Sequence, residues 1–312
     1  MTSPTALPFK TDLSLELAGL RLRNPVMVAS GTFGYGPEYA DVVDLNRLGA
    51  IVVKGISLEP WTGNRTPRLH EVTGGLLNAI GLQNPGAEGF IATYLPFLRK
   101  YDVPVVVNIW GRAVEDYVRV AERLSSEPGI HALEVNISCP NIKEGGISFG
   151  TRVDLASQVI GAVRKVTRLP LIIKLSPNVS DIRPFARAAA DEGADAISLI
   201  NSFPAMAIDI ETRRPVLANV TGGLSGAAIH PIAVKLVYEA AQAVSIPIIA
   251  MGGIRSAQEA VEFLIAGASA VAVGTATFAD PQACLRVIEG LEAYLVRHRI
   301  ASVRELIRTV RL

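Results

Sequence analysis

The sequence predicts an α/β fold, a (β/α)₈ TIM barrel formed by residues 1–312 as a single domain. Eight short, nearly continuous apolar runs alternate with helical stretches, as expected for parallel strands covered by helices. Eight strands are also the number that closes such a barrel. The alternative, an open doubly wound sheet, would require a Gly-x-Gly-x-x-Gly turn after the first strand. The glycines in 31–36 (GTFGYG) have a different spacing, which favours the barrel.

The elements follow in order along the chain. Residues 12–23 alternate apolar and polar side chains around Ala18-Gly19, which predicts a β-hairpin that plugs the N-terminal end of the barrel. The barrel strands are expected to begin near Pro25, Ala50, Pro104, Ala132, Pro170, Ala196, Pro247 and Ala270. The clearest helices are 113–125, 152–166, 182–192, 232–243 and 256–266. Ser256 and Glu259 form a capping box for the last of these helices, and Gly267 is suited to end it.

Two intervals between strands are about twice as long as the others. They cover 55–103 and 201–246. Long inserts in compact domains are usually functional or disordered, and these two contain too many apolar residues for disorder. We therefore expect ordered inserted loops at the C-terminal face of the barrel.

The composition excludes several classes of function. Thirty basic against 29 acidic residues give a net charge of +1, which argues against nucleic acid or an acidic membrane surface as a partner. No apolar run reaches the roughly 18–20 residues of a membrane span, and the N-terminus lacks the layout of a signal peptide. Cys139 and Cys284 are too few for a disulfide framework or an iron–sulfur cluster. The four histidines lack metal-ligand spacing, so we expect no metal site. Because we expect no signal peptide, membrane span or disulfide framework, we expect a cytoplasmic protein.

Polar residues or glycines end every predicted strand, at the face where barrels carry their sites. They are Ser30-Gly31, Lys54-Gly55, Asn108, Asn136 to Cys139, Lys174, Asn201-Ser202, Gly252-Gly253 and Gly274-Thr275. The glycines after strands seven and eight predict a phosphate site, because such loops present backbone amides and allow close approach. Together these ends predict a polar ligand at the barrel mouth.

Two lysines and a cysteine are candidates for chemistry. Lys54 and Lys174 follow apolar strand cores, and a buried ammonium requires an anionic partner. One could hold a substrate carboxylate, and the other could stabilise negative charge on a cofactor. Cys139 lies in a turn among amides and lysines, where a thiol can act as a base. Cys284 has a helical, apolar setting and is interpreted as a packing residue.

Five motifs carry a resemblance to a known family. They are 136–141 (NISCPN), the KxGGxxFG pattern of 143–150, 78–86 (NAIGLQNPG), 211–219 (ETRRPVLAN) and 221–226 (TGGLSG). Together they resemble the signature of class 1 dihydroorotate dehydrogenases. The sequences of 78–86 and 211–219 are most similar to those of class 1B catalytic subunits. The resemblance runs from about Leu13 to Leu291. One departure is Ala227, where the family motif has proline.

The resemblance implies one FMN per chain and a set of roles. FMN would contact Ser30, Gly31, Lys54, Gly55, Asn108, Asn136, Lys174, Ile200, Gly226, Gly252, Gly253, Gly274 and Thr275, its phosphate lying on the last four. Dihydroorotate would contact Lys54, Asn78, Ile80, Gly81, Leu82, Asn136, Asn201 and Ser202. Cys139 would take the proton from carbon 5 while hydride leaves carbon 6 for the flavin. Lys174 would stabilise the reduced flavin, and the loop 140–150, with Gly145-Gly146 as hinge, would exclude water.

Class 1B resemblance also implies a partner. An iron–sulfur flavoprotein subunit with FAD and [2Fe-2S] would pass electrons to NAD, on a homodimer core that makes a heterotetramer. The alternatives are a class 1A homodimer that uses fumarate and a related dihydropyrimidine dehydrogenase. A non-redox phosphosugar isomerase or lyase barrel, and an inactive barrel kept as a binding scaffold, also remain open.

Overall fold

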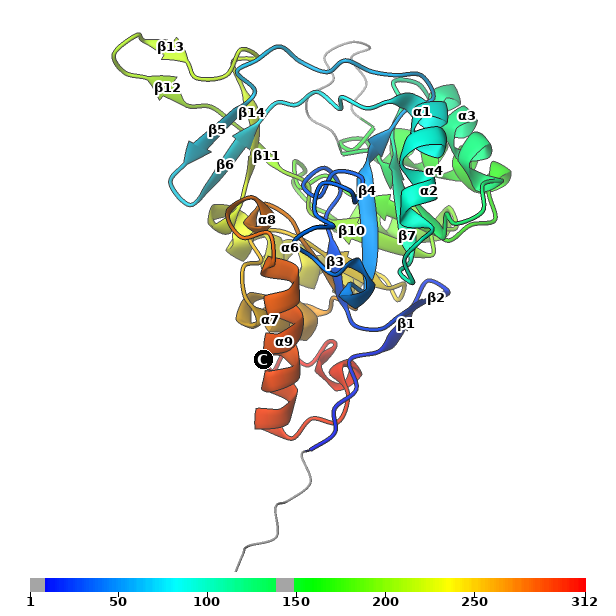
Figure 1. Ribbon diagram of the computed structural model, residues 1–312, viewed down its shortest axis with the longest axis vertical. Coiled ribbons are helices and arrows are strands. Elements are labelled where there is room, and N and C mark those ends of the chain that lie inside the picture. The colour runs from blue at the N-terminus through cyan, green and yellow to red at the C-terminus, as the bar shows by residue number, and fades with distance from the viewer. Residues whose placement is uncertain (1–8, 139–148) are drawn as a thin grey trace, which may run out of the picture.

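The computed structural model describes residues 9–138 and 149–312. Within them, eight parallel strands form a closed barrel, which confirms the predicted fold class (Figure 1). In order around the barrel the strands are β3 (Val26–Val28), β4 (Ala50–Ile56), β7 (Val105–Ile109), β8 (Ala132–Asn136), β9 (Leu171–Lys174), β10 (Ala196–Leu199), β15 (Ile248–Ala250) and β16 (Ala270–Val273), with β16 pairing with β3. Each strand begins within one residue of a predicted start.

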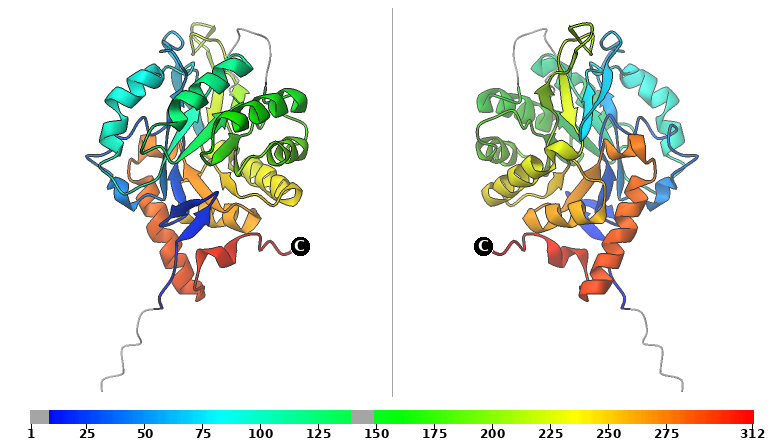
Figure 2. Two further views of the ribbon diagram at one scale, coloured as in Figure 1. Left: turned by 90° about the vertical axis from the view of Figure 1, so that its right-hand side faces the viewer. Right: turned by 90° about the vertical axis from the view of Figure 1, so that its left-hand side faces the viewer.

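Helices surround the strands, as both views in Figure 2 show. The strands are therefore buried on both faces, which explains why their sequences are continuous apolar runs. The helices are α1 (Gly86–Thr93), α2 (Leu95–Leu98), α3 (Val114–Ser125), α4 (Val153–Val166), α5 (Arg183–Asp191), α6 (His230–Ala243), α7 (Ala257–Ala266), α8 (Ala276–Ala279) and α9 (Ala283–His298). The five predicted helices are α3 to α7. The Ser256 amide donates a hydrogen bond to the Glu259 carboxylate (2.7 Å), and Gly267 caps α7 with a positive φ.

The predicted hairpin is present and closes one end of the barrel. Strands β1 (Leu15–Leu17) and β2 (Leu20–Leu22) pair in antiparallel fashion around Ala18-Gly19. Their four leucines are buried and pack against side chains that point into the barrel, among them Met27, Val106 and Ile172. These contacts close the N-terminal end of the barrel. A ligand can therefore enter only at the opposite end, where the strands have their C-termini.

The two long inserts combine into one structure. Strands β5 (Leu69–Val72) and β6 (Gly75–Asn78) come from the first insert, and β11 (Phe203–Ala205) and β14 (Gly222–Ser225) from the second. They form a four-stranded sheet in the order β11-β14-β6-β5, with antiparallel pairs such as Asn78 opposite Gly223. A two-stranded ribbon, β12 (Ile208–Asp209) and β13 (Arg214–Pro215), projects beyond this sheet in Figure 1. The inserts are therefore ordered, as predicted.

Among the helices of the described residues, none is both long and apolar enough to cross a membrane.

Candidate active site

A cavity of about 350 Å³ lies where the C-terminal ends of the barrel strands meet the sheet made by the inserts. This volume is within the range of small-molecule sites. Each of the eight barrel strands contributes to the lining, either with its last residues or with the residues that follow it. The prediction that the polar strand ends converge is confirmed.

The cavity gathers nearly all residues that the sequence singled out. Its lining includes Ser30, Gly31, Lys54, Gly55, Asn78, Ile80, Gly81, Leu82, Asn108, Asn136, Lys174, Ile200, Asn201, Ser202, Gly226, Gly252, Gly253, Gly274 and Thr275. The exception is Cys139, which lies outside the described residues together with Gly145-Gly146 and most of the predicted loop. Its role as a base therefore stays a prediction. Cys284 is fully buried in α9, and burial raises the pKa of its thiol to about 12, which confirms it as a packing residue.

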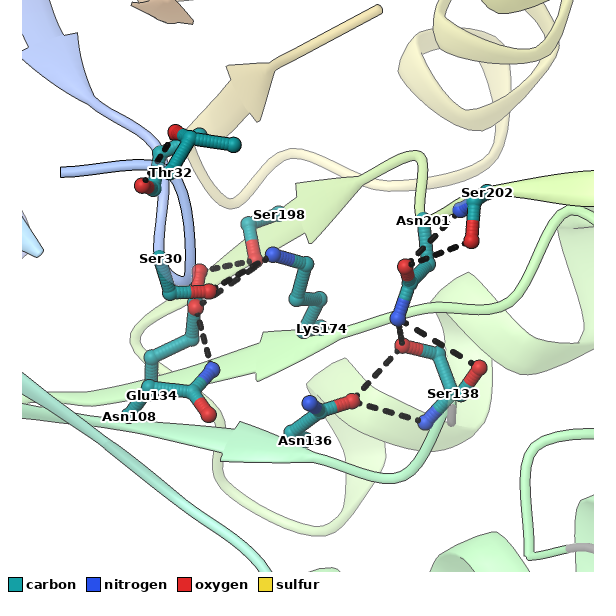
Figure 3. Close-up of polar contacts among 11 residues, drawn as sticks. Ser30, Thr32, Asn108, Glu134, Asn136, Ser138, Lys174, Ser198, Asn201 and Ser202 are labelled. Atoms are coloured by element: carbon teal, nitrogen blue, oxygen red, sulfur yellow. Dashed lines mark hydrogen bonds and ion pairs between the residues drawn. The ribbon is translucent and has the colours of Figure 1, made fainter. Parts of the chain in front are cut away.

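A network of polar side chains, all buried except the half-buried Ser30, forms the floor of the cavity (Figure 3). Glu134 accepts one hydrogen bond on each carboxylate oxygen, from Asn108 Nδ2 (2.6 Å) and from Ser198 Oγ (2.7 Å). Lys174 Nζ lies 3.7 Å from Glu134 Oε1 and donates a hydrogen bond to Ser30 Oγ (2.9 Å). These side chains come from β7 to β10 and from the end of β3, so the network ties neighbouring barrel strands together.

A second network fixes the amides on the opposite side of the floor (Figure 3). Asn136 Oδ1 accepts hydrogen bonds from the Ser138 hydroxyl (2.8 Å) and amide (3.2 Å). Asn201 Nδ2 donates to Ser138 Oγ (2.8 Å), and Asn201 Oδ1 accepts from the Ser202 amide (2.8 Å). The side-chain amides of Asn136 and Asn201 are thus held in fixed orientations through Ser138, the residue that precedes Cys139.

One end of the cavity is made of glycines that no other residue could replace without strain. Gly226, Gly252 and Gly253 have φ values of 103°, 136° and 71°, in the region that favours glycine. A Cβ at Gly252 would lie 2.7 Å from Ala233 Cβ, and one at Gly253 would lie 2.7 Å from His230 Cβ. All three glycines line the cavity, and because glycine has no side chain they line it with backbone atoms, as the phosphate prediction requires.

The charged side chains that line the cavity in the described part of the chain are all cations: Lys54, Arg68 and Lys174. Burial is the main cause that lowers the pKa of the Lys54 ammonium, and the positive charge of Arg68 adds to it. An anionic ligand would oppose both effects. The cavity is therefore electrostatically suited to an anion.

Sequence reasoning missed three polar residues of this site. Arg68 comes from the first insert, ahead of β5, where no strand end marks it. Glu134 and Ser198 are interior positions of β8 and β10. A carboxylate inside the apolar run 132–136 was a usable signal for Glu134, because buried carboxylates are rare unless paired. In the described residues no group of three or more His, Cys, Asp or Glu is arranged to hold a metal ion.

Comparison with known proteins identifies the family. The family model described as "Dihydroorotate dehydrogenase" matches residues 12–295. A relative from Geotalea daltonii is 55% identical over 303 residues, covering 97% of this chain and 99% of that protein. One from Geobacter metallireducens is 56% identical over 298 residues, covering 96% and 98%. Both are named "Dihydroorotate dehydrogenase B (NAD(+)), catalytic subunit".

A solved structure supports the fold. The crystal structure of DHODH from Eimeria tenella in complex with ferulenol matches with a TM-score of 0.81 and 23% sequence identity. The match covers 97% of this chain and 91% of that one. The family model spans most of the sequence, and the relatives share more than half of their residues with it. The chain therefore belongs to the dihydroorotate dehydrogenase family, as its motifs predicted, and its relatives are those of class 1B.

Proposed function

We propose that this chain is the FMN-containing catalytic subunit of a class 1B dihydroorotate dehydrogenase, which oxidises dihydroorotate to orotate in pyrimidine biosynthesis. The observation that carries the proposal is the cavity at the barrel mouth. It collects every described residue that the family resemblance assigns to FMN or to dihydroorotate, from all eight strands. Its charged lining in the described residues is cationic, which suits two anionic ligands, a flavin phosphate and a substrate carboxylate.

The residues present fit FMN. Gly252 and Gly253 line the cavity with backbone atoms alone, so backbone amides can approach a phosphate there, and Gly274 and Thr275 also line the cavity. Lys174 is held at the floor by Ser30 and Glu134, where its charge would favour a reduced, anionic flavin ring. FMN, when bound, supplies the acceptor for the hydride of the substrate.

The substrate side of the proposal rests on Lys54 and three asparagines. A substrate carboxylate beside Lys54 would restore the pKa that burial lowers. Asn78, Asn136 and Asn201 would donate to and accept from the polar edges of the dihydropyrimidine ring, because a side-chain amide has both functions. Asn136 and Asn201 are already oriented by Ser138, so they need little rearrangement on binding.

Proton removal is assigned to Cys139. We propose that its thiolate takes the proton from carbon 5 while hydride leaves carbon 6, so that the carbon–carbon double bond of orotate forms. Ser138, directly before it in the sequence, is buried and hydrogen-bonded to two asparagines that line the cavity. A positioned base contributes typically 10²–10⁴-fold to such a step.

Onward electron transfer requires a second subunit. The two cysteines of this sequence cannot supply the four ligands of an iron–sulfur cluster. We propose a homodimer of this chain that joins iron–sulfur flavoprotein subunits carrying FAD and [2Fe-2S], a heterotetramer that reduces NAD⁺. The names of the relatives, which contain "catalytic subunit" and "NAD(+)", support this part of the proposal.

The experiment is to purify the chain alone, add FMN, and mix it anaerobically with dihydroorotate. We expect flavin absorbance that is bleached by dihydroorotate, slow or no turnover with fumarate, and co-purification of an iron–sulfur flavoprotein from the native source. Fumarate turnover by the chain alone would favour the class 1A alternative. Failure of the chain to retain FMN would favour the alternative of a phosphosugar isomerase or lyase, because that chemistry needs only the phosphate loops.

A further inference from the structure

Glu134 is a charged residue in the interior of the barrel to which the motifs assign no role. Its side chain is 2% exposed and lies below the cavity, on the middle of β8. A buried carboxylate is costly unless hydrogen bonds and a counter-charge compensate it. Glu134 has both, since each oxygen accepts one hydrogen bond and Lys174 is its ion-pair partner.

Glu134 and Lys174 lie at different depths relative to the cavity (Figure 3). Asn108 on β7 and Ser198 on β10 each donate a hydrogen bond to a different oxygen of the carboxylate and so fix its position. The carboxylate in turn attracts Lys174 Nζ, which also reaches Ser30 Oγ on the far side of the barrel floor. Lys174 lines the cavity, whereas Glu134 is not part of the lining. The carboxylate therefore sits behind the lysine as seen from the ligand.

We propose that Glu134 is a positioning residue that holds the Lys174 ammonium at the cavity floor and partly compensates its charge, and thereby sets the reduction potential of the bound flavin. The inference rests on the proposed function, because it concerns FMN in this cavity. A fully uncompensated ammonium would favour the reduced, anionic flavin strongly and would retain electrons. A carboxylate behind it lowers the potential, so that electrons move on to the partner subunit.

The other charged groups of the lining do not take over this role. In the described residues they are Lys54 and Arg68, both cations, so the carboxylate that faces Lys174 is that of Glu134. Removing the Glu134 charge therefore leaves the cavity with positive charge alone and shifts the flavin towards its reduced form.

The test is the isosteric variant Glu134→Gln, which keeps an oxygen for the Asn108 amide and a polar nitrogen for the Ser198 hydroxyl. FMN is added to the full-length chain, and the ratio of reduced to oxidised flavin is measured against reference dyes at a fixed solution potential. The measurement is made at one pH for all variants. We expect the ratio to rise on the order of tenfold, because a unit charge 3.7 Å from the Lys174 ammonium is removed. A residue with a purely structural role would not shift this ratio.

The matched control is Glu239→Gln, which removes one Glu–Lys ion pair from the outer surface of α6 and should leave the ratio unchanged. If Glu134→Gln fails to fold, Ser198→Ala is the second variant. It removes one of the two hydrogen bonds that partly compensate the negative charge of the carboxylate. That charge then acts more strongly on Lys174 and the flavin, so the ratio should fall by a smaller factor.

An unchanged or lower ratio in Glu134→Gln with FMN bound overturns the inference, as does an unchanged or higher ratio in Ser198→Ala if that variant has to be used. Failure of the proposed function gives a different result. In that case the unmodified chain would not bind FMN, or dihydroorotate would not bleach it. Normal bleaching of the unmodified chain with an unchanged ratio in the variant would refute only the role of Glu134.

Discussion

Replacement of Lys174 by methionine is the sharpest test of how the cavity floor is built. Methionine has a similar length and no charge, so the substitution leaves the Glu134 carboxylate buried without its cation. The two side chains are 6% and 2% exposed, and the charged atoms are 3.7 Å apart. At an effective dielectric constant near 20, two unit charges at this distance attract each other by about 4.5 kcal/mol.

Breaking a buried pair by removing one partner typically costs about 3–5 kcal/mol. Asn108 and Ser198 continue to donate hydrogen bonds to the carboxylate, so we expect the low end, a loss of about 3 kcal/mol in the free energy of unfolding. The double variant Lys174→Met with Glu134→Gln contains no buried charge at this place. It should regain most of the loss and unfold within about 1 kcal/mol of the unmodified chain, because replacing both members of a buried pair is often nearly neutral.

The assay is urea unfolding of the FMN-free chain, followed by circular dichroism, for the two single variants and the double variant. Lys235→Met is the matched control. Lys235 pairs with Glu239 at 2.9 Å, but the lysine is 62% exposed, so its loss should change stability by less than about 0.5 kcal/mol. If Lys174→Met is as stable as the unmodified chain, or if the two single losses simply add in the double variant, the reasoning about the floor is wrong.

Three further predictions concern ligands. Orotate affinity should fall as the pH rises through the lowered pKa of Lys54, because only the ammonium attracts a carboxylate. Orotate titrations at several pH values should show this fall, and the affinity of Lys54→Met should not change with pH. Gly253→Ala should weaken FMN binding at least about tenfold in fluorescence titrations, because φ is +71° and the new Cβ would lie 2.7 Å from His230 Cβ; unchanged affinity would contradict the phosphate cradle. Cys139→Ala should still bind FMN and orotate, while stopped-flow reduction by dihydroorotate slows about 10²–10⁴-fold; near-normal reduction would exclude Cys139 as the base.

The barrel could be predicted because its signals are local. Each strand is a short apolar run followed by a polar residue, and parallel strands that alternate with helices all end at the same face. That geometry alone brings Lys54, Asn136 and Lys174 together, although they are far apart in the sequence. The hairpin was predictable for the same reason, since its alternation and the Ala18-Gly19 turn are contained in 12 residues.

The insert sheet could not be predicted in this way. Its strands have three or four residues each, and β14 is rich in glycine, so no periodicity marks them. The pairing joins β6 to β14 through partners such as Asn78 and Gly223, which lie 145 positions apart. Such a pairing depends on where the barrel places the two inserts in space. Arg68 belongs to the first insert, so its position in the cavity also depends on where that insert lies. It was missed for the same reason.

The sequence by itself determined the barrel, the plug, the family and the residues at the strand ends, because all of these follow from local patterns or from motifs. The tertiary structure alone decided the electrostatics of the site. Whether Glu134 and Ser198 face the barrel axis or the helices depends on how the strands tilt when the barrel closes. Only that closure places a carboxylate behind Lys174, at a distance where charge, burial and hydrogen bonding act together.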